Sequence, residues 1–310
     1  SNTAVGYTAL LKNTASNNSA VGDGALICNT TGGANNAFGS TALDNNTTGS
    51  ANTAIGNDAL DANTTASDNV AVGNGAMFAN TTGCQNTAIG RRALNTNITG
   101  DNNVAVGFCA LKLNTADNNT AVGHDALKTN STGTNNTAVG LCTLKTNTTG
   151  ASNSALGILA LELNTEGDFN TAIGREALQS NTTADNNTAV GYKSLEANTT
   201  GTLNVAVGSC ALLCNITGAE NTAVGMNAAR LTTGGANVAV GHSALEDNTS
   251  GASNTALGRE ALHTNTTASN NVAVGKRALY LNTTGTTNTA VGQNSLHSNT
   301  TASDNTAVGA

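Results

Sequence analysis

The motif Asn-x-Ala-Φ-Gly, in which Φ is an apolar residue, occurs nineteen times in this chain of 310 residues. The first copy is Asn2–Gly6 and the last is Asn305–Gly309. Successive motif glycines are seventeen positions apart in fifteen of the eighteen intervals and sixteen positions apart in the other three. A short period over the whole length predicts a stack of near-identical units, whose function belongs to the stack. We therefore expect residues 1–310 to form one continuous repeat domain.

Composition excludes several classes of protein. Aromatic residues make up 2% of the chain and charged residues 10%, and proline and tryptophan are absent, so an ordinary globular core is not expected. The low charge and the apolar content of 38% also disfavour a disordered tail. The net charge of −7 is thinly spread and provides no basic face for nucleic acid. No apolar run approaches the roughly 20 residues of a membrane helix, so membrane insertion is not expected.

Each repeat can be numbered from its motif glycine, taken as position 0. Position −4 is Asn and position −2 is Ala in all nineteen copies, while position −1 is mostly Val. Position −3 is Thr or Val in most copies. This alternation predicts a short strand that buries positions −3 and −1, and the glycine is expected to end the strand at a corner.

A second apolar signal follows the corner. Position +4 is Leu in sixteen of eighteen repeats, and position +5 is mostly polar or charged. This pattern predicts a second short strand with +4 inward and +5 facing water. Asn at +7 then begins Asn-Thr-Thr-Gly/Ala, which is typical of a tight bend. The three short repeats lose their residue in this bend, at Asn13–Ala15, Asn114–Ala116 and Leu231–Gly234.

Helices are disfavoured, because a 17-residue period does not hold a 3.6-residue stripe in phase and each repeat carries Gly, Thr and Asn. The sequence predicts an all-β fold: a parallel β-solenoid (β-roll) of about 18 coils with two short strands per 17-residue repeat. Successive coils are expected about 4.8 Å apart.

Each coil has few large apolar side chains to offset the entropy of ordering a whole repeat, so we expect self-association. The invariant Ala at −2 is predicted to lie at the contact between chains. Replacement by Leu is expected to weaken association at Ala105, Ala121 and Ala138. Replacement of the +5 residues Lys112, Lys128 and Lys145 is expected to have almost no effect.

The segments Asn103–Leu111 and Asn204–Leu212 both read Asn-Val-Ala-Val-Gly-x-x-Ala-Leu. This pattern resembles the head repeat of YadA-like trimeric autotransporter adhesins, and still more the shaft repeats of phage-type tail fibres that carry a C-terminal chaperone domain. The resemblance covers the whole chain, although the unit is longer than the adhesin repeat. It implies a left-handed β-roll, three chains per fibre and an extracellular, cell-surface or virion-surface location.

Few residues suggest chemistry. The six cysteines are interpreted as small fillers or unpaired thiols, with an interchain disulfide as the alternative: Cys28, Cys84, Cys109, Cys142, Cys210 and Cys214. The four histidines occupy the variable positions +1 and +5, where no metal site or general base is expected: His124, His242, His263 and His297. Five aspartates precede the motif Asn and are assigned to turns rather than to calcium binding: Asp68, Asp101, Asp117, Asp185 and Asp304.

Glycosylation sequons recur, as at Asn46–Thr48 and Asn63–Thr65, and are interpreted as turn residues, with glycosylation as the alternative. No catalytic, cofactor-binding or metal-binding residue is predicted, and the protein is not expected to be an enzyme or to need a cofactor.

The expected function is that of a structural fibre: a segment of an adhesin or tail-fibre shaft that acts as a rigid spacer for attachment. A receptor on a host or another cell would then be bound through parts outside this chain. The alternatives are a self-polymerising surface filament and an ice-binding β-solenoid, the latter because Thr recurs at −3, +8 and +9.

Overall fold

The computed structural model describes residues 1–309, which contain one three-residue strand per coil and no helix. The chain divides into two compact units, Ser1–Asn153 and Ser154–Ala310. The strands of the first unit are β1 (Thr3–Val5), β2 (Ser19–Val21), β3 (Asn36–Phe38), β4 (Thr53–Ile55), β5 (Val70–Val72), β6 (Thr87–Ile89), β7 (Val104–Val106), β8 (Thr120–Val122) and β9 (Thr137–Val139). Those of the second are β10 (Ser154–Leu156), β11 (Thr171–Ile173), β12 (Thr188–Val190), β13 (Val205–Val207), β14 (Thr222–Val224), β15 (Val238–Val240), β16 (Thr255–Leu257), β17 (Val272–Val274), β18 (Thr289–Val291) and β19 (Thr306–Val308).

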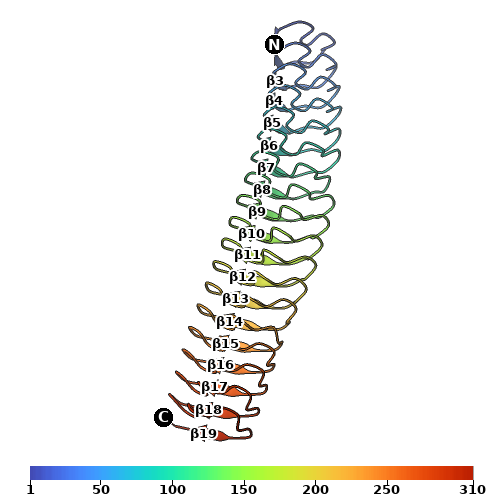
Figure 1. Ribbon diagram of the computed structural model, residues 1–310. Coiled ribbons are helices and arrows are strands. Elements are labelled where there is room, and N and C mark those ends of the chain that lie inside the picture. The colour runs from blue at the N-terminus through green and yellow to red at the C-terminus, as the bar shows by residue number, and fades with distance from the viewer. Residues whose placement is uncertain (310) are drawn as a thin grey trace. The chain divides into compact units, whose positions relative to one another are not determined.

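Within each unit every strand pairs in parallel with the strand of the next coil (Figure 1). The register places each repeat position on the same position of its neighbour, so that Ala105 pairs with Ala88 on one side and Ala121 on the other. The prediction of a parallel β-solenoid, with about 18 turns and a 17-residue repeat, is therefore confirmed.

The prediction of a second strand in each repeat is wrong. Residues +1 to +6 form turns, in which positions +2 and +4 adopt left-handed backbone, as at Arg92 (φ 56°) and Leu94 (φ 50°). Such a backbone is unusual for a bulky residue, and hydrogen bonds between coils hold it. The Arg92 amide donates to the Asn74 carbonyl at 3.1 Å, and the Leu94 amide donates to the Ala110 carbonyl at 2.9 Å. The inward direction of +4 is confirmed, since Leu94 is fully buried.

The inward and outward faces of the first strand are the opposite of those predicted. Ala at −2 points into the coil, where Ala105, Ala121 and Ala138 are all 0% exposed. Position −1 points outward, and Val122 is 36% exposed. The prediction that the Ala row lies at a contact between chains is therefore wrong, because the coil's own interior covers it. An interior this narrow accepts a methyl group at −2 but leaves no room for valine.

The motif glycine is required at the corner that ends each strand. Gly107 has φ +135°, and a Cβ added there would lie 2.5 Å from the carbonyl oxygen of Gly123 in the next coil. A side chain at this position would collide with backbone in a conformation that only glycine adopts readily.

Asparagine at −4 forms the first of two polar ladders through the coil interior. The Asn86 amide donates to Oδ1 of Asn69, one coil earlier, at 2.9 Å. Its own side-chain nitrogen donates to the carbonyl oxygen of Gly100 at 2.8 Å. Because these asparagines are buried, the hydrogen bonds satisfy groups that water does not reach.

Asparagine at +7 forms the second ladder. Nδ2 of Asn63 donates to Oδ1 of Asn46 at 2.8 Å and to the carbonyl oxygen of Ala66 at 3.1 Å. This confirms that the Asn-Thr-Thr segment closes a turn, and it places the asparagine inside the turn.

The second ladder breaks at short repeats. In the part of the chain that the structure describes, the buried Oδ1 atoms of Asn97 and Asn215 accept no hydrogen bond. In the coil after Asn97, Nδ2 of Asn114 instead donates to the Ala116 carbonyl at 2.7 Å. In the coil after Asn215, position +7 is Thr232, which has no amide to donate. The altered bend of a short repeat thus leaves the Asn acceptor of the preceding coil without a partner.

Candidate functional site

The most regular feature of the surface is the outer strand face, formed by positions −3 and −1 of every coil. Position −3 is half-buried in most coils, and many −1 side chains are exposed. The large exposed members of the first unit are Val5, Phe38, Ile55, Ile89 and Val122. Those of the second unit are Leu156, Ile173, Val207, Val224, Val238, Leu257, Val291 and Val308. No copy of the repeat carries a charged residue from −3 to −1, so this face is an uncharged surface of methyl and hydroxyl groups.

Two open hollows on the surface of residues 1–309 lie among charged and polar side chains. One, with a volume of about 370 Å³, lies beside the short repeat and is lined by Asp101 and Asp117 among others. Both carboxylates already accept backbone hydrogen bonds, from the Cys84 amide at 2.7 Å and from the Asp101 amide at 2.8 Å. Each of the two carboxylates therefore already serves the backbone of a neighbouring coil.

The other aspartates singled out from the sequence also serve the backbone. Asp185 accepts a hydrogen bond from the Asp168 amide at 2.7 Å. Asp68 and Asp304 adopt left-handed backbone, with φ 62° and 61°. Aspartate tolerates this conformation better than most residues, so the assignment of these residues to turns is confirmed.

The sequons are structural as well. Asn46 and Asn63 are fully buried, and their side-chain nitrogens donate to the second ladder. N-glycosylation attaches the sugar to this nitrogen, so the folded chain does not present it for modification.

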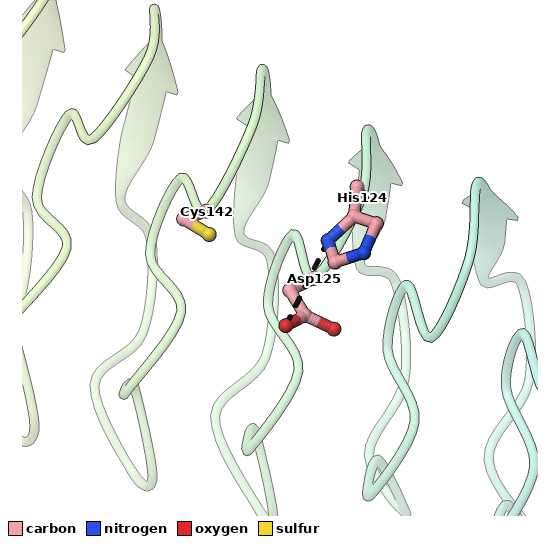
Figure 2. A group of neighbouring side chains, drawn as sticks. All are labelled: His124, Asp125 and Cys142. Carbon is pink, nitrogen blue, oxygen red and sulfur yellow. Dashed lines mark ion pairs between the residues drawn. The ribbon is translucent and has the colours of Figure 1, made fainter.

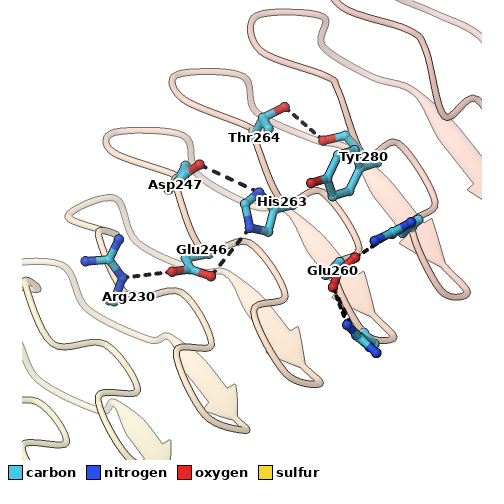
Figure 3. Close-up of polar contacts among 9 residues, drawn as sticks. Arg230, Glu246, Asp247, Glu260, His263, Thr264 and Tyr280 are labelled. Carbon is cyan, nitrogen blue, oxygen red and sulfur yellow. Dashed lines mark hydrogen bonds and ion pairs between the residues drawn. The ribbon is translucent and has the colours of Figure 1, made fainter.

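A row of charged and aromatic side chains occupies position +5 of successive coils in the second unit. Figure 3 shows Glu246 between Arg230 and His263, with Glu246 oxygens 3.0 Å from Nε of Arg230 and 3.5 Å from Nε2 of His263. The His263 ring stacks on Tyr280, and Tyr280 stacks on His297. Burial raises the pKa of Glu246, but hydrogen bonds from Ser243 and Arg230 outweigh it, so the pKa lies below its ordinary value.

Glu260 is held by two arginines. Nε of Arg277 and Nη2 of Arg259 both contact its carboxylate, the latter at 2.9 Å. The hydrogen bond from Arg277 is the main reason why the pKa of Glu260 lies below its ordinary value. A carboxylate kept ionised between two cations is a structural ion pair and a poor general base.

The cysteines carry free thiols: Cys28, Cys84, Cys109, Cys142, Cys210 and Cys214. Cys109 is buried and the others are half-buried. This agrees with their interpretation as fillers or unpaired thiols within one chain.

One group of side chains was not foreseen from the sequence. His124, Asp125 and Cys142 bring an imidazole nitrogen, a carboxylate oxygen and a sulfur within 4.8 Å of one another (Figure 2). Asp125 and Cys142 both occupy position +2 of successive coils, so their 17-residue separation was the available signal. Histidine, aspartate and cysteine positions taken one residue type at a time give no such signal.

No helix in residues 1–309 is long and apolar enough to cross a membrane. Comparisons with known protein families and with curated proteins give no match to this chain.

Proposed function

We propose that this chain is a shaft segment of an extracellular structural fibre, at a cell or virion surface, which acts as a rigid spacer for attachment. The observation that carries the proposal is the outer strand face, an uncharged apolar row repeated in every coil. An apolar row of this kind marks an interaction surface, because isolated soluble chains rarely expose large contiguous apolar patches.

The partner of this face is further copies of the same chain. A second copy has the same coil spacing, so within each unit its −1 side chains meet those of the first in successive coils without loss of register. The face carries no charge that would oppose contact between like chains or select a charged partner. Self-association through valine and isoleucine also supplies burial that the narrow alanine interior does not.

Three chains per fibre, a left-handed coil and the extracellular setting come from the resemblance to adhesin heads and tail-fibre shafts. In such a fibre the receptor is bound by parts outside this chain. We do not assign an enzymatic role, since the repeated positions serve packing, ladders and turns.

Lysine substitutions on the outer strand face test the proposal. Ile89 and Val122 are 42% and 36% exposed, so Ile89→Lys and Val122→Lys leave the coil interior intact. Burying two cations per chain at a contact is costly, so the double variant is expected to become a monomer by light scattering. The matched control is Leu141→Lys, a change at an exposed apolar residue outside this face. Equal masses for the double variant, the control and the wild type would overturn the proposal.

A second candidate function is ice binding, and the strand geometry favours it more than the sequence did. Thr at −3 lies on the same outer strand face as the −1 row, in an in-register parallel sheet. Methyl and hydroxyl groups therefore repeat about 4.8 Å apart between coils and about 6.6 Å apart along each strand. Ice binding needs this face free, whereas a fibre covers it. Thermal hysteresis that Val122→Lys abolishes would support ice binding, and its absence in the wild type would exclude it.

A further inference from the structure

The group formed by His124, Asp125 and Cys142 lies just after strands β8 and β9, in the first unit. His124 and Asp125 occupy positions +1 and +2 of one coil, and Cys142 occupies position +2 of the next. Figure 2 shows the Cys142 sulfur directed toward the coil that carries the other two side chains. One nitrogen, one oxygen and one sulfur thus lie within 4.8 Å of one another.

Asp125 supplies an independent observation. Asp125 is 7% exposed, and its Oδ1 atom is buried without a hydrogen-bond partner. The other oxygen, Oδ2, lies 3.1 Å from Nζ of Lys128 and 3.7 Å from Nδ1 of His124. A buried carboxylate oxygen without a partner is unfavourable, and a cation bound at Oδ1 would supply the missing interaction.

We propose that His124, Asp125 and Cys142 bind a transition-metal dication of the Zn²⁺ type. An imidazole nitrogen of His124, a carboxylate oxygen of Asp125 and the Cys142 sulfur are its three protein ligands, and water completes a tetrahedron. Imidazole and thiolate select such ions over Mg²⁺ and Ca²⁺, which prefer oxygen ligands. On binding, the Cys142 thiol releases its proton to solvent and a metal–sulfur bond forms.

The surroundings of the site allow a metal ion to enter and the three ligand atoms to move toward it. His124 is exposed and Cys142 is half-buried, so an ion and its water ligand can approach from the side of these two residues while Asp125 stays buried. Zinc holds nitrogen and oxygen at about 2.0–2.2 Å and sulfur at about 2.3 Å, so the ligand atoms need to approach one another to about 3.3–3.7 Å. Side-chain rotations of the exposed His124 and the half-buried Cys142 provide this movement. The Phe108 ring stacks on His124 with centroids 5.0 Å apart and limits the tilt of the imidazole.

Lys128 opposes the metal, because its ammonium group already pairs with Oδ2 of Asp125. A dication at Oδ1 would lie a few ångströms from this positive charge. Removal of the charge in Lys128→Ala is therefore expected to tighten metal binding by about threefold or more. A residue that merely stabilised the coil would not give this result.

The test is a titration of the full chain with Co²⁺ under reducing conditions, followed by displacement with Zn²⁺. The expected result is one ion per chain, with a thiolate-to-cobalt charge-transfer band that Zn²⁺ removes. Cys142→Ser should abolish the band, and His124→Ala should weaken Zn²⁺ binding in calorimetry by about 100-fold or more. His124→Ala changes an exposed side chain, so it tests the site without endangering the fold.

Two matched controls distinguish this site from adventitious binding. Cys210 also occupies position +2 and His242 also occupies position +1, but neither belongs to a group of this kind among residues 1–309. Cys210→Ser and His242→Ala should bind one ion with unchanged affinity. The proposal is overturned if the band is absent in the wild type, if it persists in Cys142→Ser, or if the controls lose affinity as much as the site variants do.

Discussion

The interior of each coil accepts very few side-chain sizes. Ala138 at −2 and Leu127 at +4 are fully buried, and the asparagine ladders fill the remaining space with amide groups. The next residue along the strand, Val139, points outward. Size is therefore constrained at −2 and relaxed at −1, which agrees with invariant Ala at the first position and four different apolar residues at the second.

This difference predicts a large effect for a substitution at −2 and a small one for a substitution at the next position, −1. Ala138→Leu forces three extra carbons into a filled interior and is expected to lower the free energy of unfolding by about 1–3 kcal/mol. Val139→Leu adds one carbon outside the coil, where Leu156 and Leu257 already occur at −1, and is expected to cost less than Ala138→Leu even where this face meets another chain. Denaturant unfolding of the two variants measures both values. A larger loss for Val139→Leu would mean that the inward and outward faces are assigned incorrectly.

At the scale of the element, each coil is held by its neighbours more than by itself. The three-residue strand is short, and backbone hydrogen bonds between coils continue through the turns at +2 and +4. The charged side chains lie outside this framework and modify it according to their local partners. The pKa of Glu260, which lies between two arginines, is lowered. The pKa of Asp61, which lies beside two aspartates, is raised.

Glu260 is expected to stabilise the coil at neutral pH. The hydrogen bond from Arg277 holds the pKa of Glu260 below its ordinary value of 4.5. A carboxylate with a lowered folded pKa stabilises the fold above its unfolded pKa and loses this effect as pH falls through the folded pKa. Glu260→Gln should therefore lower the unfolding midpoint at pH 7, and the difference from wild type should vanish in acid. A difference that does not depend on pH would contradict the ion-pair explanation.

Asp61 is expected to behave in the opposite way. Burial raises its pKa above the ordinary value of 3.8, and the charges of Asp44 and Asp58 raise it further. The ionised form is therefore disfavoured in the folded chain, so Asp61→Asn should raise the unfolding midpoint at pH 7. The difference should shrink as pH falls through the raised pKa and Asp61 takes up its proton. Asp304→Asn, at an exposed aspartate, is the charge-matched control and should have little effect.

At the scale of the whole molecule, the sequence predicts the stack but not which way its side chains face. The spacing of the motif glycines determines the coils, the parallel register and the position of the bend, all of which the structure contains. Alternation along Thr120–Val122 is compatible with either face inward, and only the width of the coil decides for Ala121. The left-handed backbone at Leu94 could not be predicted, because hydrogen bonds between coils override the preference of leucine.

The candidate metal site could not be predicted from the sequence for a related reason. Asp125 and Cys142 are adjacent only after the chain is wound with a 17-residue period, and the repeat supplies that period. The sequence does not reveal that Oδ1 of Asp125 is buried without a partner, because this depends on how Lys128 and His124 pack around Oδ2.

The mass of the wild-type chain in solution tests the central claim of the proposed fibre most directly. Light scattering is expected to give about 92 kDa, which is three chains of 30.6 kDa, if the outer strand face is covered by other copies of the chain as proposed. A mass of 30.6 kDa would contradict the fibre account and leave that face free, as ice binding requires. A mass that grows without limit with concentration would also contradict the trimer and would favour a self-polymerising filament.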